Sequence, residues 1–421
     1  MTKKLFNSEF LRNVFTLISG TAIAQIIPIA LQLILRRIYS PDVFGAFAVY
    51  ISVVGILVVI STLRYEMAVV LPKDDKDATN IVGLSFLISV FVNIVFLILI
   101  IFLKDFIIKL LNFPVEYSYW LYFMPLSTLL LSSYHAINYW LIRKKAFKAS
   151  SINKMSRRSI EGVFQLSLGI LRKPFGLAIG DFFGNLANII SGLIQLRKSS
   201  FRFSNINWAT IKYVAKRYIE FPKYQAIPYL LNTISLLFPI FIINRIYSEE
   251  ITGYYDLSRM VLALPLALIS MSISQVLFQK LTEKKNKRLP VLKNILNTSK
   301  ILALLTIPAI IILYFFGTEI FGFLFGKEWG VSGEYTSILV FSYSLKFVVS
   351  PISIVFPALE KIKIASIWQI FYFCAIITLI FLPKIAINDF LLIYVGIELI
   401  AYTIYFLLIY RITKNYDKSL I

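Results

Sequence analysis

The chain has 421 residues, of which 58% are hydrophobic and 15% are charged, and its mean hydropathy is +0.77. A soluble domain is nearer half apolar and a quarter charged, so this composition excludes an ordinary soluble protein. The apolar residues gather in runs of roughly twenty, the length that crosses a hydrocarbon core of about 30 Å. A transmembrane barrel would instead show shorter, alternating segments. The sequence therefore predicts an all-α polytopic membrane protein.

We expect twelve transmembrane helices. The first run has no small-residue cleavage site, so it is interpreted as a retained span. The fifth run is the weakest prediction because it is short and carries Glu161. In chain order the expected spans are residues 14–35, 43–63, 80–103, 120–142, 157–171, 174–196, 225–244, 255–278, 299–317, 333–357, 362–383 and 388–410.

The net charge of +21 first needs a topological interpretation. With the N-terminus placed inside, 32 of the 43 Lys and Arg residues fall in cytoplasmic segments and nine in outer loops. Such a bias predicts that both termini are cytoplasmic. Because topology explains most of the basic excess, we do not expect nucleic acid as a partner.

An eleven-residue stretch occurs twice. Arg37–Phe47 reads RIYSPDVFGAF and Arg245–Tyr255 reads RIYSEEITGYY, 208 residues later, with five identical positions. A repeat of this kind predicts two copies of one unit. Because each copy holds six spans, the two copies form a parallel repeat with a pseudo-two-fold axis along the membrane normal. We expect the glycines Gly45 and Gly253 to permit a tight turn into the next span.

The repeat divides the chain into three parts. We predict an N-terminal six-helix bundle at residues 1–198, a cytoplasmic linker at 199–224 and a C-terminal six-helix bundle at 225–421. Within the linker, Asn207 can cap a short helix on which Trp208, Ile211 and Tyr218 share one face. Basic residues lie beside that face, as is typical of a helix in the membrane interface.

Ionisable residues at membrane depth cost about 2.5–3.5 kcal/mol each and usually face a cavity or a partner. Lys346 and Glu398 lie near the middle of the tenth and twelfth spans. Two interpretations stay open: the residues form a buried ion pair, or they form a cationic site with a titratable neighbour. Arg259 either pairs locally with Asp256 or faces a cavity. Arg64 ends the second span, where it could also extend to the interface.

Prolines interrupt the first helix of each half. Pro28 has Gln25 and Gln32 beside it, and Pro239 lies between Asn232 and Asn244. Paired breaks in corresponding segments of two halves indicate a substrate site. We therefore include Gln25, Pro28, Gln32, Asn232 and Pro239 among the candidate cavity residues.

Enzyme chemistry has little support. The sequence has no Walker loop, no HExxH pair and no carboxylates at metal-ligand spacing within a span, so we expect no catalytic residue, metal site or cofactor. His135 is the only histidine, and the single Cys374 excludes a disulfide framework. Transport is the default interpretation.

Three stretches carry a resemblance to a known family. They are NVFTLISGTAIAQ (Asn13–Gln25), LRYEMAVVLPKDDKDATNI (Leu63–Ile81) and AKRYIEFPKYQAIPYLLNTIS (Ala215–Ser235). Together with the twelve-span layout, they resemble Wzx-type oligosaccharide flippases, the polysaccharide-export branch of the multidrug/oligosaccharidyl-lipid/polysaccharide (MOP) superfamily. The twelve expected spans do not include the two extra C-terminal spans expected of the lipid II flippase branch.

The resemblance implies a MATE-like fold with a V-shaped cavity, residence in the bacterial inner membrane, and coupling to a proton or sodium gradient. It implies that the substrate is an oligosaccharide on undecaprenyl pyrophosphate, with membrane lipids and the polysaccharide polymerase and chain-length machinery as partners. We expect a monomer. Because a pyrophosphate needs fixed cations, Arg64, Arg259 and Lys346 are the predicted substrate-binding residues and Glu398 the predicted ion-coupling residue.

Three alternatives stay open. A drug/cation antiporter of the same superfamily would share the two halves but should have an acidic cavity. A polysaccharide polymerase, a membrane enzyme, would bring a long periplasmic loop, which this sequence lacks. A major-facilitator carrier would have a Gly/Asp/Arg-rich loop between the second and third spans, unlike Arg64–Asp77.

Overall fold

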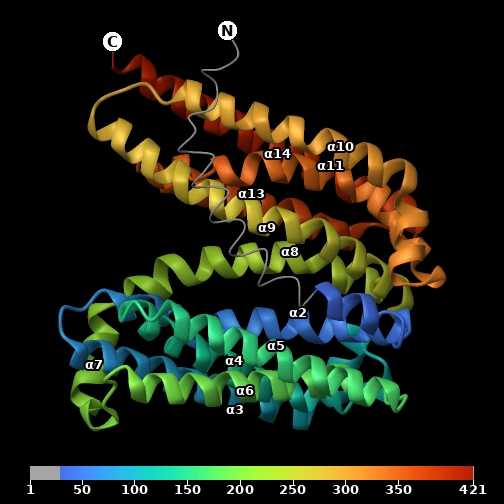
Figure 1. Ribbon diagram of the computed structural model, residues 1–421, viewed down its shortest axis with the longest axis horizontal. Coiled ribbons are helices and arrows are strands. Elements are labelled where there is room, and N and C mark those ends of the chain that lie inside the picture. The colour runs from blue at the N-terminus through green and yellow to red at the C-terminus, as the bar shows by residue number, and fades with distance from the viewer. Residues whose placement is uncertain (1–28, 421) are drawn as a thin grey trace. The chain divides into compact units, whose positions relative to one another are not determined.

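The computed structural model describes residues 29–420. Figure 1 shows this part of the chain as helices joined by short turns, with no strand in it. The predicted all-α class is therefore confirmed. The described residues divide into two compact units: the N-terminal unit, Ile34–Gly253, and the C-terminal unit, which holds residues 254–420 together with residues 29–33.

The N-terminal unit is built from long helices that pack side by side, coloured blue to green in Figure 1. Ser40 and Pro41 open the first of them, where proline suits the first helical position because no amide donor is needed there. The helices are α2 (Pro41–Thr62), α3 (Asp75–Leu111), α4 (Trp120–Arg143), α5 (Phe147–Ile170), α6 (Gly176–Lys198), α7 (Trp208–Arg217) and α8 (Ile227–Ile246).

The C-terminal unit, yellow to red in Figure 1, contains most of the next helix and all that follow. The helices are α9 (Glu249–Asn286), α10 (Leu292–Phe325), α11 (Gly330–Ile352), α12 (Val355–Ala358), α13 (Ile362–Ile377) and α14 (Ile387–Lys418). In this unit α10 and α11 make the most extensive helix pairing, and α14 packs along α11.

Nine helices within residues 29–420 are long and apolar enough to cross a membrane. Two further long helices, α4 and α5, occupy the positions of the fourth and fifth expected spans but are not among these nine. The first expected span, 14–35, lies mostly outside the described residues. A multi-pass membrane protein is thus confirmed, whereas the count of twelve stays a prediction.

The two copies of the repeat pack against each other through their glycines. A Cβ atom on Gly45 would lie 1.7 Å from the carbonyl oxygen of Glu249, and one on Gly253 would lie 1.9 Å from that of Pro41. Since Pro41 and Glu249 correspond at the 208-residue offset, the contact is reciprocal. Both glycines lie in the second turn of a helix, so they permit two helix backbones to touch and not, as predicted, a tight turn.

A reciprocal amide contact joins the ends of α3 and α8 beside this crossing. Asn112, in the left-handed conformation that ends α3, donates its side-chain amide to the carbonyl of Asn244 at 2.8 Å. The Asn244 amide donates to the carbonyls of Leu111 and Asn112, both at 2.8 Å. These bonds satisfy carbonyls left free at the helix end. The structure thus groups α8 with the N-terminal unit, and the division at 1–198, 199–224 and 225–421 stays a prediction.

The linker helix forms as expected. The side chain of Asn207 accepts a hydrogen bond from the amide of Ala209 at 2.8 Å and so caps α7. Ile211 and Tyr218 are buried in a core that also contains Trp140 and Tyr65. Trp208, which was expected on the same face, is 63% exposed. The apolar side of α7 therefore packs on the N-terminal unit, and Trp208 lies outside that contact.

Candidate functional site

Lys346 and Glu398 form a buried ion pair in the C-terminal unit. Their side chains are 5% and 0% exposed, and the Lys346 Nζ contacts Glu398 Oε1. Two hydroxyls donate to the same oxygen, from Tyr372 at 3.0 Å and from Tyr394 at 2.6 Å. Three donors on one carboxylate oxygen compensate the charge that burial would otherwise penalise. The pair thus joins α11 to α14, with α13 completing the contact.

Aromatic rings surround the Lys346 ammonium. Its Nζ lies 4.5 Å from the ring centroid of Tyr343, 5.6 Å from Tyr402 and 5.9 Å from Tyr394, distances at which the ring faces attract a cation. The second oxygen of Glu398, Oε2, is buried and has no hydrogen-bond partner within the described part of the chain. We call Lys346, Glu398, Tyr372, Tyr394 and Tyr402 the tyrosine-carboxylate cluster.

Sequence reasoning identified the two charged members of this cluster and missed the tyrosines. A signal was present, because Tyr394 and Tyr402 stand four residues before and after Glu398 and share its helix face. Tyr372 comes from a different helix, so its position depends on the packing of α13 against α14.

Arg259 makes the local pair that the sequence offered as one of two alternatives. Its Nη2 lies 2.9 Å from Asp256 Oδ1, one turn earlier on α9. The Arg259 side chain is 24% exposed, and its Nε has no partner within residues 29–420. The guanidinium therefore keeps one buried donor, Nε, that its Asp256 pair does not use.

Arg64 belongs to the N-terminal unit and follows α2 in a left-handed conformation, with φ 64°. Its guanidinium lies 4.0 Å from the ring centroid of Tyr229, and its Nη1 is 3.3 Å from Glu66 Oε1. Glu66 is almost fully buried, and this burial raises the pKa of its carboxyl above the ordinary value of 4.5. The fixed charge of Arg64 is thus close to a carboxyl that burial pushes toward its neutral form.

The three predicted cations therefore share one feature: each has a carboxylate partner nearby in sequence or on a neighbouring helix. They lie in two units, with Arg64 in the first and Arg259 and Lys346 in the second. Within the C-terminal unit, the ring of Tyr343 lies against the Lys346 ammonium and also lines the pocket described below.

The residues predicted around the helix breaks are only partly described. Gln25 and Pro28 lie outside the described residues. Gln32 lies in the short described part of the first expected span. Pro239 is buried inside α8, which continues across it as one helix, and Asn232 is half-buried about two turns earlier. Their roles in a cavity stay predictions.

A second buried polar cluster lies within the N-terminal unit. Asp181 on α6 accepts from Asn185 at 3.0 Å, from Arg157 on α5 at 3.3 Å and from Tyr50 on α2 at 3.4 Å. These bonds tie three helices together. In residues 29–420 no group of three or more His, Cys, Asp and Glu side chains is arranged to hold a metal ion.

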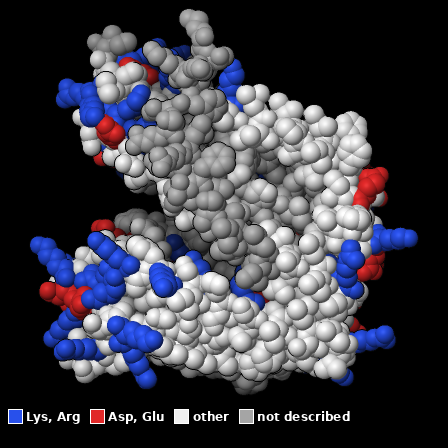
Figure 2. Space-filling view, in the orientation of Figure 1, with Lys and Arg blue, Asp and Glu red and all other residues white. Residues whose placement is uncertain are grey.

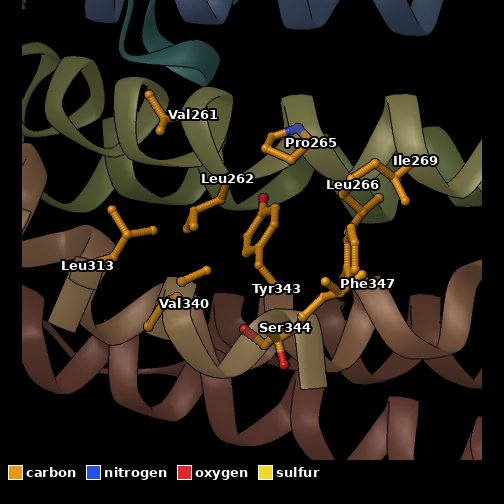
Figure 3. Close-up of a pocket in the computed structure, with 13 residues that line it drawn as sticks. Val261, Leu262, Pro265, Leu266, Ile269, Leu313, Val340, Tyr343, Ser344 and Phe347 are labelled. Atoms are coloured by element: carbon orange, nitrogen blue, oxygen red, sulfur yellow. The ribbon is translucent and has the colours of Figure 1, made fainter. Parts of the chain in front are cut away.

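An apolar pocket of about 350 Å³ lies between α9, α10 and α11. Figure 3 shows Tyr343 pointing from α11 toward Pro265 and Leu262 on α9. Because its lining is almost entirely aliphatic or aromatic, it suits a hydrocarbon chain and not a charged headgroup. The lining residues are Val261, Leu262, Pro265, Leu266, Ile269, Leu305, Thr306, Ala309, Leu313, Val340, Tyr343, Ser344 and Phe347.

Comparison with solved structures defines the fold class. An inward-facing multidrug resistance MATE transporter of the MOP superfamily matches with a TM-score of 0.75 at 12% identity, over 94% of this chain and 96% of that one. The lipid II flippase MurJ, in an inward closed conformation, matches with a TM-score of 0.74 at 13% identity, over 95% and 90%. The protein therefore has the fold of the MOP-superfamily transporters.

The family follows from the sequence. The polysaccharide biosynthesis protein family model matches residues 34–334, and the chain belongs to that family. Teichuronic acid biosynthesis protein TuaB of Bacillus subtilis (strain 168) is 23% identical over 154 residues, which are 37% of this chain and 32% of TuaB. The chain thus aligns with about a third of that relative's length. The resemblance stated from the sequence is confirmed.

Proposed function

We propose that the protein translocates an oligosaccharide linked to undecaprenyl pyrophosphate across the bacterial inner membrane by alternating access, without a covalent step. The observation that carries this proposal is the membership of the polysaccharide biosynthesis family together with a MOP-transporter fold. The solved flippase that shares the fold is named for a lipid-linked substrate, which supports the same substrate class.

Arg64, Arg259 and Lys346 are proposed to hold the pyrophosphate. A diphosphate bound in a dry site needs charge-assisted donors, which guanidinium and ammonium groups supply. Because each cation has a carboxylate partner, a bound pyrophosphate must compete with that carboxylate. Binding of the pyrophosphate would separate each cation from its carboxylate, so the affinity for the substrate would depend on whether the ion pair is formed. A transporter that must also release its substrate can use this dependence.

Glu398 is proposed as the ion-coupling residue, driven by a proton or sodium gradient. Its carboxylate is already bound by a lysine and two tyrosines. Protonation of Glu398, or a sodium ion in the place of the Lys346 ammonium, would therefore free that ammonium for the substrate. One charge moved through 100 mV supplies about 2.3 kcal/mol, enough to bias this exchange.

The membrane placement and the partners belong to the same proposal. We place the protein in the inner membrane with both termini cytoplasmic, because most Lys and Arg residues fall on one side of the expected spans. The polymerase and chain-length machinery would receive the translocated unit. We assign the protein no catalytic residue and no cofactor.

A chromosomal deletion of the gene tests the function without knowledge of the sugar. We expect the surface polysaccharide to be lost and lipid-linked oligosaccharide to accumulate inside, and both to be restored by the wild-type gene. A drug/cation antiporter predicts instead that export is unchanged and that the cells become sensitive to cationic dyes. That second result would reject the flippase.

Variants in the complemented strain test the cations. Arg64→Gln and Arg259→Gln should each abolish export, and Arg259→Lys should retain part of it. The matched control is the double variant Arg158→Gln with Glu161→Gln, which removes a comparable pair at 2.9 Å from α5. Export that survives both Gln variants in normally inserted protein would place the anion site elsewhere.

A further inference from the structure

The proposed translocation makes no use of a pocket of about 380 Å³ at one end of the N-terminal unit. It is formed by the turn between α4 and α5 with the first turn of α5, and by the last turn of α6 with the residues that follow it. Its lining differs from that of the apolar pocket because it combines ammonium groups, a side-chain amide and hydroxyls with two small apolar residues. The lining residues are Lys144, Ala146, Ala149, Gln195, Lys198, Ser199 and Ser200.

A buried tryptophan fixes the floor of this pocket. The Trp140 indole is fully buried and donates from Nε1 to Ser199 Oγ at 2.9 Å, and Ser199 Oγ donates to the carbonyl of Leu196 at 2.7 Å. Trp140 also packs edge-on against Phe201, with centroids 4.8 Å apart. The turn after α6 is thereby held against α4, and the pocket between them does not depend on a mobile side chain for its shape.

The pocket is strongly basic. The turns that form it read RKKAFKAS (Arg143–Ser150) and QLRKSSFR (Gln195–Arg202), and neither contains an acidic residue. Lys144, which lines the pocket, shares the carboxylate of Asp75 with Arg143, whose Nε lies 3.1 Å from Asp75 Oδ1. Two cations on one carboxylate leave a positive excess. Figure 2 shows Lys and Arg side chains gathered over this end of the N-terminal unit, at the lower left of the view.

Several donors in the pocket are free to bind a ligand. Within residues 29–420, the side chains of Gln195, Lys198 and Ser200 make no hydrogen bond or ion pair. An ammonium, an amide and a hydroxyl that line one basic pocket match the oxygens of a phosphate group, which accepts several charge-assisted hydrogen bonds at once.

The surroundings identify the source of that phosphate. The pocket lies where long apolar helices end, and two neighbouring apolar side chains are open to the surroundings: Phe147 is 62% exposed and Ile142 is 36% exposed. A free phosphorylated metabolite would make no contact with these apolar side chains. A phospholipid can place its headgroup in the basic pocket and its acyl chains along the apolar residues.

We propose that this pocket is a binding site for the phosphate headgroup of an anionic phospholipid, with Lys198 and Lys144 as its cations. A lipid bound here ties α4, α5 and α6 to the surface of the bilayer. The site is separate from the proposed transport residues, so its function does not depend on the flippase proposal.

Native mass spectrometry of the delipidated full-length protein tests the site with phosphatidylglycerol as the probe. Replacing Lys144 and Lys198 by Gln should weaken phosphatidylglycerol binding about tenfold. The matched control replaces Lys212 and Lys216 on α7, two cations of the same unit that do not line the pocket. It should change binding by less than about twofold. Equal losses in the two double variants would overturn the site, because they would show diffuse attraction to basic residues.

Three further measurements keep the result interpretable. Lys198→Gln alone removes a cation that has no partner, so it should weaken binding even if the loss of the Lys144–Asp75 pair disturbs folding; unchanged binding in this variant overturns the site. Arg at both positions should retain binding, and its failure to do so counts against a phosphate. Phosphatidylcholine should bind weakly. If inorganic phosphate binds the pocket while phosphatidylglycerol does not, the lipid source is wrong.

Discussion

Gly45 and Gly253 pack backbone against backbone, and a Cβ atom on Gly45 would lie 3.0 Å from the amide nitrogen of Gly253. The two residues occupy the same position in the two copies of the repeat, 208 residues apart. A side chain at either position meets backbone, which cannot rotate away as a flexible side chain would. This steric restriction explains why both copies of the repeat have glycine at this position.

Alanine at either glycine should destabilise the protein. We expect Gly45→Ala and Gly253→Ala each to cost about 1–3 kcal/mol because the helix backbones must move apart. The two changes act on one contact, so the double variant should cost less than the sum. Thermal melting of the purified protein in detergent measures this. Gly396→Ala on α14 is the control, since a Cβ there meets nothing within 4 Å. Equal melting temperatures for Gly45→Ala and Gly396→Ala would contradict the crossing.

The ion pair between Lys346 and Glu398 should show strong coupling. Either single change, Lys346→Gln or Glu398→Gln, leaves one buried charge without its partner and should destabilise the protein by about 3–5 kcal/mol. The double variant restores neutrality and should recover much of that loss. A double-mutant cycle on melting temperatures measures the coupling. Additive effects would show that the two charges do not depend on each other.

Tyr394→Phe provides a finer test of the tyrosine-carboxylate cluster. It removes one donor to Glu398 and should cost about 1–3 kcal/mol, more than Tyr410→Phe near the end of the same helix. The same melting assay applies, and equal costs would mean that the hydroxyl is dispensable.

The carboxyl of Glu66 should make stability depend on pH. Burial raises its pKa in the folded protein, so folding favours the protonated form. The stability it contributes is therefore present below its ordinary value of 4.5 and is lost as the pH rises through the higher folded value. Glu66→Gln should make the melting temperature less dependent on pH, in the pH range that begins near 4.5 and extends upward. Glu220→Gln, at an exposed carboxylate of the same unit, should leave the slope as it is. An unchanged slope in Glu66→Gln would assign the pH dependence to other groups.

Orientation in the membrane can be tested with single cysteines, because Cys374 is the only one and can be replaced by Ser. Lys384→Cys, in an expected outer loop, should react with an impermeant maleimide on intact spheroplasts. Lys287→Cys, in an expected cytoplasmic segment, should react only after permeabilisation. The reverse pattern would invert the proposed topology.

The sequence predicted helix positions better than helix extents. Apolar runs located the eleven helices that follow the first expected span because burial in lipid requires such runs. Several of these helices continue beyond the expected spans. For example, α9 was expected at 255–278 and spans Glu249–Asn286, with Lys284 and Lys285 in its last turn. A helix satisfies its own backbone, so it can extend past the membrane with polar residues, and hydrophobicity alone does not show where it ends.

The candidate site was predicted in part for a similar reason. Lys346 and Glu398 were recognised because charge at membrane depth is costly, and equal depth made their pairing feasible. Tyr372 could not be assigned to them, because nothing local links α13 to that carboxylate. The repeat likewise identified Gly45 and Gly253 as important without showing that their partners are Glu249 and Pro41.

The reciprocal contact of Gly45 with Glu249 and of Gly253 with Pro41 has the geometry of an isologous interface, in which one patch meets its own copy. A chain of half this length would carry one such patch and could make the same contact with a second identical chain. A contact of this geometry is the same whether its two copies belong to separate chains or to one polypeptide.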